Sequence, residues 1–184
     1  MSAVFPNDMI QRIHYCTAIV KGNPADPDKP VRQQTYLRAL HTTGMFYLHL
    51  GNFVERPKRG VLASPPPCTS NPPCLVGRVR VQVREEKGSD VNLATALLRD
   101  AFLGDFEQAV VVSNDSDLAG AVRVVRVDAG LPVHVVSPYA TATKAMRRAA
   151  TAWTVRDQTL LARHQLPPAL TLPDGTTLLK PLRW

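Results

Sequence analysis

Residues 78–118 read RVRVQVREEKGSDVNLATALLRDAFLGDFEQAVVVSNDSDL, and this stretch decides the fold. Residues 78–83 alternate polar and apolar side chains, which predicts a strand with one covered face. From Ser89 the apolar residues recur at helical spacing, and Gly104 is a typical helix stop. Residues 109–112 are continuously apolar, as in a strand buried on both faces. This order of elements predicts parallel strands joined by a right-handed crossover.

The same alternation of strands and helices extends outward from this stretch. Downstream, we expect a helix at 118–125, a strand at 132–136 and a basic helix at 143–152. Upstream, we expect a strand at 10–20, a helix at 31–43 and a strand at 45–53. Five prolines between residues 65 and 73 predict an extended loop that separates two blocks. The chain is therefore expected to be an α/β protein with a mainly parallel sheet.

Composition narrows the class of protein further. The 184 residues are 45% hydrophobic and 20% charged, as expected of a globular chain, and no apolar run is long enough to cross a membrane. Three cysteines and the lack of a secretory signal predict a reducing, cytoplasmic location. The formal net charge of +7 favours a polyanionic partner. Residues 140–184 hold seven basic and two acidic residues.

Acidic residues follow two of the expected strands. Asp90 lies after the strand at 78–83, and Asp115 and Asp117 follow the strand at 109–112. Ligands of such sheets bind beyond the carboxyl ends of the strands, so we expect the three aspartates to converge there. Oxygen ligands without histidine or cysteine suit Mg²⁺ or Mn²⁺ and predict a metal that can activate water on a phosphodiester. The alternative is that these residues cap helices, although capping explains one aspartate for each helix and not two.

The run from Glu85 to Leu118 resembles the signature of NYN domains, which belong to the PIN-like nuclease superfamily. Residues 12–40, the HLGNF at 49–53 and the ending at 172–184 resemble bacterial members of this family. The resemblance implies a three-layer, PIN-like (Rossmann-like) α/β fold and a Mg²⁺-dependent ribonuclease. It also implies that Asp90, Asp115 and Asp117 are both the catalytic residues and the metal ligands.

One part of the family pattern is not found in this sequence. Family members open with a strand that ends in an Asp-Gly-any-Asn motif and supplies a further metal ligand, followed by a helix. This chain starts near the expected second strand, and Asn7-Asp8 does not replace the motif because no apolar strand precedes it. We therefore expect that the genuine start codon lies upstream, and that the first strand, central in related folds, is missing.

The remaining candidates are residues that could bind the substrate. They are Lys87, Ser113, Asn114, Ser116, Arg147 and Arg148. Cys68 and Cys74 lie in the proline loop, where free thiols are favoured over a zinc site because their spacing is wide. We expect an NYN domain over residues 1–152, with a proline-rich loop at 57–77, and a basic extension over 153–184.

Three functions follow from these observations. The leading one is a ribonuclease that uses Mg²⁺ or Mn²⁺ and acts on RNA. The alternative is a catalytically impaired domain that binds RNA or a protein partner through the basic C-terminal part. A domain for a small phosphorylated ligand is less favoured because the sequence has no glycine-rich phosphate loop. The sequence is also compatible with a homodimer.

Overall fold

The computed structural model describes residue 5, residues 7–61 and residues 79–182. Its first block consists of a strand, a helix and a long strand pair. These elements are β1 (Ile13–Ala18), α1 (Lys29–His41), β2 (Phe46–Gly60) and β3 (Val79–Lys87). Pro30 lies in the first turn of α1, where its missing N–H costs nothing. The five clustered prolines, Cys68 and Cys74 lie outside the described residues.

The second block alternates helices and strands, as the sequence predicts. Its elements are α2 (Ser89–Leu103), β4 (Ala109–Val112), the short 3₁₀ helix η1 (Ser116–Leu118), α3 (Ala119–Val127), β5 (Val133–Ser137), α4 (Lys144–Ala149) and β6 (Ala152–Val155). Gly104 ends α2 in a left-handed conformation (φ 72°), as expected for a glycine stop. Three further elements end the chain: α5 (Gln158–Arg163), β7 (Ala169–Thr171) and β8 (Thr177–Leu179).

The described strands form two three-stranded sheets and one short hairpin, β7–β8. In the first sheet, β1 is parallel to β2, and β2 is antiparallel to β3. In the second sheet, β4, β5 and β6 are parallel to one another. The parallel pairs confirm the α/β class. The described strands do not form one continuous sheet, because none of them pairs with both β1 and β4.

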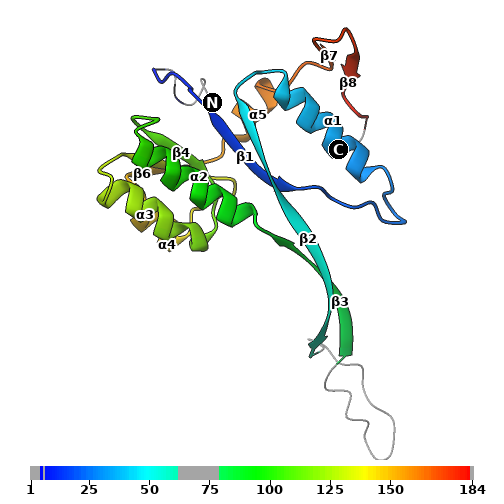
Figure 1. Cartoon of the computed structure of the whole chain (residues 1–184), viewed down its shortest axis with the longest axis horizontal. Coiled ribbons are helices and arrows are strands. Elements are labelled where there is room, and N and C mark those ends of the chain that lie inside the picture. The colour runs from blue at the N-terminus through cyan, green and yellow to red at the C-terminus, as the bar shows by residue number, and fades with distance from the viewer. Residues whose placement is uncertain (1–4, 6, 62–78, 183–184) are drawn as a thin grey trace, which may run out of the picture.

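The β2–β3 pair extends far beyond the sheet from which it starts. Pairing between β1 and β2 ends at Gly51, whereas the pairing of β2 with β3 continues to Gly60. We call residues 52–60 and 79–87 the arm, and Figure 1 shows it extending away from the helices. Pro57 lies within the arm, where β3 is the only described strand beside β2, so a proline without an N–H can be accommodated.

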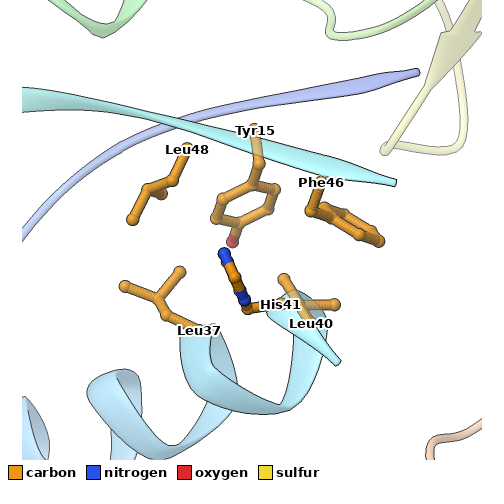
Figure 2. Close-up of a pocket in the computed structure, with 6 residues that line it drawn as sticks. All are labelled: Tyr15, Leu37, Leu40, His41, Phe46 and Leu48. Atoms are coloured by element: carbon orange, nitrogen blue, oxygen red, sulfur yellow. The ribbon is translucent and has the colours of Figure 1, made fainter. Parts of the chain in front are cut away.

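The first sheet lies between two helices. On one face, Tyr15, Phe46 and Leu48 meet Leu37, Leu40 and His41 of α1 around a small apolar pocket, in which the Tyr15 ring points toward His41 (Figure 2). Burial raises the pKa of Tyr15. The opposite face packs against α2. Because side chains alternate along a strand, His14 and Cys16 face α2 while Tyr15 faces α1.

The second sheet and its helices contain the main hydrophobic core. Val133 and Val135 of β5 are fully buried, as are Val122 and Val125 of α3 and Met146 of α4. Leu97 and Ala101 join α2 to the same cluster. The strand at 109–112 was expected to be buried on both faces, but Val112 is half exposed. Helix α2 thus packs against both the core and the first sheet.

A buried carboxylate links α2 to the first sheet. Asp100, 5% exposed, accepts a hydrogen bond from Arg12 at 2.9 Å and one from Arg99 at 2.8 Å. His14 Nε2 lies 2.7 Å from the same carboxylate. Burial by itself would raise the pKa of Asp100, but the hydrogen bond and charge of His14, together with Arg12, outweigh it and lower that pKa. The carboxylate is therefore ionised and compensated.

A second histidine extends this linkage into β2. His14 Nδ1 lies 2.8 Å from His49 Nε2, so the order of contacts is Asp100, His14, His49. Two imidazoles can share a hydrogen bond only while one of the two nitrogens is unprotonated. Burial and the neighbouring His14 lower the pKa of His49, whereas Asp100 acts in the opposite direction. The neutral form of His49 is therefore favoured in the folded protein.

Replacing Asp100 with asparagine should destabilise the fold by about 3 kcal/mol, because Arg12 and His14 lose the charge that compensates them. For a chain of this size we expect a fall in melting temperature of roughly 6 to 12 °C, measured by scanning calorimetry. Asp105→Asn is the matched control: it removes the other, more exposed partner of Arg12, and such surface pairs contribute about 0–1 kcal/mol. Equal losses in both variants would contradict this role of Asp100.

Acid should destabilise the protein below about pH 6.5, the pKa of a free histidine. Because the pKa of His49 is lowered in the folded state, the unfolded chain binds more protons as the pH falls, and folding loses free energy. The lowered pKa of Asp100 has the same sign and acts below about pH 4. Urea unfolding at pH 7.5 and 5.5 should show a smaller loss in His49→Gln than in the wild type or in the exposed His164→Gln. An equal loss in all three proteins would refute the assignment to His49.

Candidate functional site

Asp90 lies in the first turn of α2, directly after the turn that follows β3. Gly88 forms this turn with φ +100°, a conformation that favours glycine. The backbone amide of Ser89 donates to Glu86 Oε1 at 3.1 Å, and the Ser89 hydroxyl donates to the same oxygen at 2.8 Å. Glu86 therefore provides the hydrogen bonds of a helix cap, and the Asp90 carboxylate does not.

Gly51 of β2 allows the turn at Glu86–Ser89 to lie close against the first sheet. A Cβ atom at position 51 would lie 2.6 Å from the Lys87 carbonyl oxygen and 3.1 Å from the Ser89 nitrogen. Those contacts are with backbone atoms, so any side chain at position 51 would displace the turn. The Asn92 amide reinforces the packing by donating to the Leu50 carbonyl at 3.4 Å. The position of Asp90 is thus set by the packing of β2.

Asp115 and Asp117 lie where β4 ends and η1 begins. The Ser113 hydroxyl accepts from the Asp115 N–H at 3.1 Å, and Asp115 Oδ1 accepts from the Asp117 N–H at 2.9 Å. Asp115 is therefore the N-cap of η1, which is what the capping alternative predicts for it. Among the described residues, no hydrogen bond or ion pair involves the Asp117 carboxylate, so capping does not account for it.

The three aspartates interact electrostatically across the end of the two strands. The pKa of Asp90 is raised, first by desolvation and then by the charges of Asp115, Glu86 and Asp117. Among the described residues, no group donates a hydrogen bond to the Asp90 carboxylate or forms an ion pair with it. Its exposed side chain therefore stands among like charges without a compensating cation.

Cys16 lies near this carboxylate, on the α2 face of β1. Desolvation and the charge of Asp90 raise the pKa of the Cys16 thiol to about 11. A thiol with such a pKa is protonated near neutral pH, and only the thiolate is a strong nucleophile. Cys16 is therefore a neutral neighbour of the site.

The predicted substrate-binding residues near the carboxylates make local contacts. Asn114 Oδ1 accepts from the Thr143 N–H at 2.6 Å, and Thr143 in turn caps α4. Lys87 forms an ion pair with Glu85 at 3.4 Å. Ser116 is exposed at the start of η1. Asn114 therefore ties the loop that carries Asp115 to the helix that carries the predicted arginines.

Arg147 and Arg148 lie on the last turn of α4, and both are exposed. The guanidinium of Arg147 lies over the Trp153 ring, 5.4 Å from its centre, in a cation–π contact. Trp153 belongs to β6, which pairs with β5 and crosses the boundary expected at residue 152. These arginines are connected to the carboxylates through Asn114 and Thr143.

The donor chemistry of the site fits Mg²⁺ or Mn²⁺ only in part. Carboxylates are the ligands that these ions prefer, and Mg²⁺ is commonly held by one or two carboxylates with water completing its shell. Within the ranges that the structure describes, no group of three or more histidine, cysteine, aspartate or glutamate residues is placed to hold an ion. The arrangement thus fits a site of one or two carboxylates and water, and not a preformed cage of three aspartates.

Sequence reasoning missed the contact among Asp100, His14 and His49. The two histidines show no ligand spacing, because they come from different strands and meet through the pairing of β1 with β2. Period-2 alternation could have placed each histidine on one face of its strand. The register that brings the two together is a tertiary feature.

The comparisons with known proteins give three findings. The chain is 33% identical over 110 residues to 6-hydroxy-3-succinoylpyridine 3-monooxygenase HspA of Pseudomonas putida, covering 58% of this chain and 34% of that protein. A crystal structure of a protein of unknown function from Vibrio parahaemolyticus aligns with a TM-score of 0.46 and 15% identity, over 77% of this chain and 67% of the other. Residues 7–157 match the NYN domain, so the chain belongs to the NYN domain family.

Proposed function

We propose that this chain hydrolyses RNA phosphodiester bonds with Mg²⁺ or Mn²⁺ at the site of Asp90, Asp115 and Asp117. Membership of the NYN family supports a nuclease-like, RNA-related function. The observation that carries the proposal is the Asp90 carboxylate, which lacks a described partner and whose pKa is raised by desolvation and by the charges of Asp115, Glu86 and Asp117. Such a gathering of negative charge is relieved when a divalent cation binds between the groups.

The residues of the chain would have distinct roles in this reaction. A bound ion would lower the pKa of its water and balance the charge that develops on the phosphate. Asp90, Asp115 and Asp117 would hold it directly or through water, with Asp115 oriented by its bond to the Asp117 N–H. Ser113, Asn114 and Ser116 would keep the loop in place beside the scissile phosphate, and Lys87 would contribute positive charge. Arg147 and Arg148 would contact the RNA farther from the cut.

Asp90→Asn and Asp115→Asn should each lower RNA cleavage about a hundredfold, a loss of roughly 3 kcal/mol of transition-state stabilisation. Asparagine caps helices as well as aspartate does, so Asp115→Asn tests the charge and not the cap. Asp90→Asn should fold with equal or higher stability, because it removes repulsion from Asp115 and Asp117. The readout is cleavage of a labelled RNA with Mg²⁺ and with chelator.

Asp128→Asn is the matched control, since Asp128 is exposed at the end of α3 and should not affect cleavage. Activity that survives in chelator, or in Asp115→Asn, would show that the proposed mechanism is wrong.

Metal binding can be measured apart from cleavage. Mg²⁺ at ten times its dissociation constant should stabilise the folded chain by about 1.4 kcal/mol, which raises the melting temperature by roughly 3 to 6 °C. Asp90→Asn should lose most of this shift, whereas Asp128→Asn should keep it. An equal shift in both variants would place the ion elsewhere.

The alternative function is an RNA-binding or protein-interaction module without catalysis. Its specific support is that the described residues form no group of three metal ligands. RNA binding without turnover, together with no Mg²⁺-dependent thermal shift, would favour this alternative over the ribonuclease.

We also propose that a strand with the Asp-Gly-any-Asn motif fits between β1 and β4. In the described part of the chain, β1 pairs only with β2 and β4 pairs only with β5, so each leaves one edge of backbone groups without a strand. Such a strand would join the two sheets and add a carboxylate to the site. Reading the DNA upstream of the first codon in frame tests this proposal, and a frame that lacks the motif would argue against it.

The relative from Pseudomonas putida supplies a further candidate, oxygen insertion into a hydroxypyridine. The chain spans about a third of the length of that relative, so the activity in its name belongs to a much longer protein. Dioxygen consumption with 6-hydroxy-3-succinoylpyridine and a reductant would support this candidate, and a rate equal to that without the pyridine would count against it.

A further inference from the structure

The arm carries more positive charge than its own ion pairs use. Residues 52–60 and 79–87 contain six basic and three acidic residues. Glu85 is an ion-pair partner of Arg56 at 2.8 Å, of Lys87 at 3.4 Å and of Lys58. The hydrogen bond from Lys58 is the main reason that the pKa of Glu85 is lowered, to about 2. On this face of the arm, Arg56, Lys58 and Lys87 thus share one carboxylate, so each of them has an acidic partner.

The other face of the arm is compensated only near its base. Arg84 forms an ion pair with Glu55 at 2.7 Å. Arg59 and Arg80, farther out, are exposed and have no acidic partner among the residues that the structure describes. Within the described ranges, these two arginines are therefore the cations of the arm that have no acidic partner and could meet an external anion.

Arg59 and Arg80 are also held close to each other. They are directly opposite in the β2–β3 register, and side chains at opposite positions start about 4.5–5.5 Å apart. Like charges at opposite positions destabilise a strand pair, so the placement of Arg59 opposite Arg80 does not stabilise the fold. Two guanidinium groups at that separation can donate to one phosphate or to two adjacent ones. This arrangement suits the repeating phosphates of a nucleic acid.

The arm starts beside the carboxylate site. Lys87, its last residue, is three positions before Asp90, and Arg80 is seven residues from Lys87. At about 3.3 Å per residue, Arg80 lies roughly 23 Å along the arm from its base. That length corresponds to about seven nucleotides of a helical strand, at roughly 3.4 Å per nucleotide. An RNA that is bound at the carboxylates must therefore extend about seven nucleotides beyond them to reach the outer end of the arm.

We propose that Arg59 and Arg80 form a phosphate-binding clamp for the backbone of the RNA substrate, about seven nucleotides from the carboxylate site. The clamp rests on the proposed function in one respect, namely that RNA is the polyanion. It binds the backbone without regard to base sequence, because guanidinium groups on phosphates carry no base information. Its part is to hold and orient a long RNA, while the aspartates act on the bond that is cut.

The test compares two double variants that remove the same charge from the same arm. Arg59→Gln/Arg80→Gln removes the free pair, and Arg56→Gln/Arg84→Gln removes two arginines that are already paired with glutamates. Binding of a fluorescent 20-nucleotide single-stranded RNA is measured by anisotropy in chelator at several salt concentrations, so that no cleavage is needed.

The free-pair variant should lower the magnitude of the salt slope for the long RNA by about 1.4, that is about 0.7 for each phosphate that the arginines no longer neutralise. Its affinity at 0.1 M salt should fall about ten- to thirtyfold, while the control variant changes less than threefold. The melting temperature of the free-pair variant should stay equal or rise, because the repulsion between Arg59 and Arg80 is removed.

Equal reductions of affinity in both variants would overturn the clamp, since net charge alone would then explain binding. Unchanged binding in the free-pair variant would overturn it as well. Because binding is measured in chelator, a failure of the ribonuclease proposal leaves this result intact. Conversely, cleavage that depends on Asp90 together with an unchanged salt slope would overturn the clamp and leave the ribonuclease standing.

Discussion

The buried carboxylate of Asp100 is the interaction on which the rest of the structure depends. It forms ion-pair contacts with Arg12, His14 and Arg99, and it joins the first sheet to α2. Removing such a charge from water is costly unless cations compensate it, so the carboxylate fixes where β1 can lie. Helix α2 is also part of the hydrophobic core of the second block. One side chain thus couples two sheets that no described strand connects.

The candidate site depends on the same helix at its other end. Glu86 and Gly88 form the turn that starts α2, and Gly51 lets β2 approach this turn closely. Because Glu86 provides the cap, Asp90 is left without a structural partner among the described residues. Asp115, in contrast, caps η1 and is held in place by its local hydrogen bond. A structurally unused carboxylate beside an oriented one is an arrangement suited to binding a cation.

The arm adds a second electrostatic feature to the molecule. Four of its cations form ion pairs with Glu85 or Glu55, whereas Arg59 and Arg80 are left without an acidic partner in the described part of the chain. Arg59 and Arg80 thus lie near the outer end of the β2–β3 strand pair, whereas the carboxylates follow its base. Figure 1 shows the course of this strand pair. The carboxylates by themselves would repel a polyanion. The two arginines allow the polyanion to be held on the arm, at a distance from the carboxylates.

Local sequence pattern predicted α1 to α4 and β1 to β5, because apolar periodicity, Pro30 and Gly104 act within a few residues. It did not predict β6, α5, β7 or β8, and the helix expected at 143–152 ends at Ala149. It also placed Asp90, Asp115 and Asp117 at strand ends, where they interact electrostatically. Only the tertiary structure decided that the described strands form two sheets, that β2 continues through Pro57 to Gly60, and that Asp100, His14 and His49 meet. Strand register and the choice of partners depend on contacts between residues that are far apart in the chain, and a single sequence carries no periodic signal for such contacts.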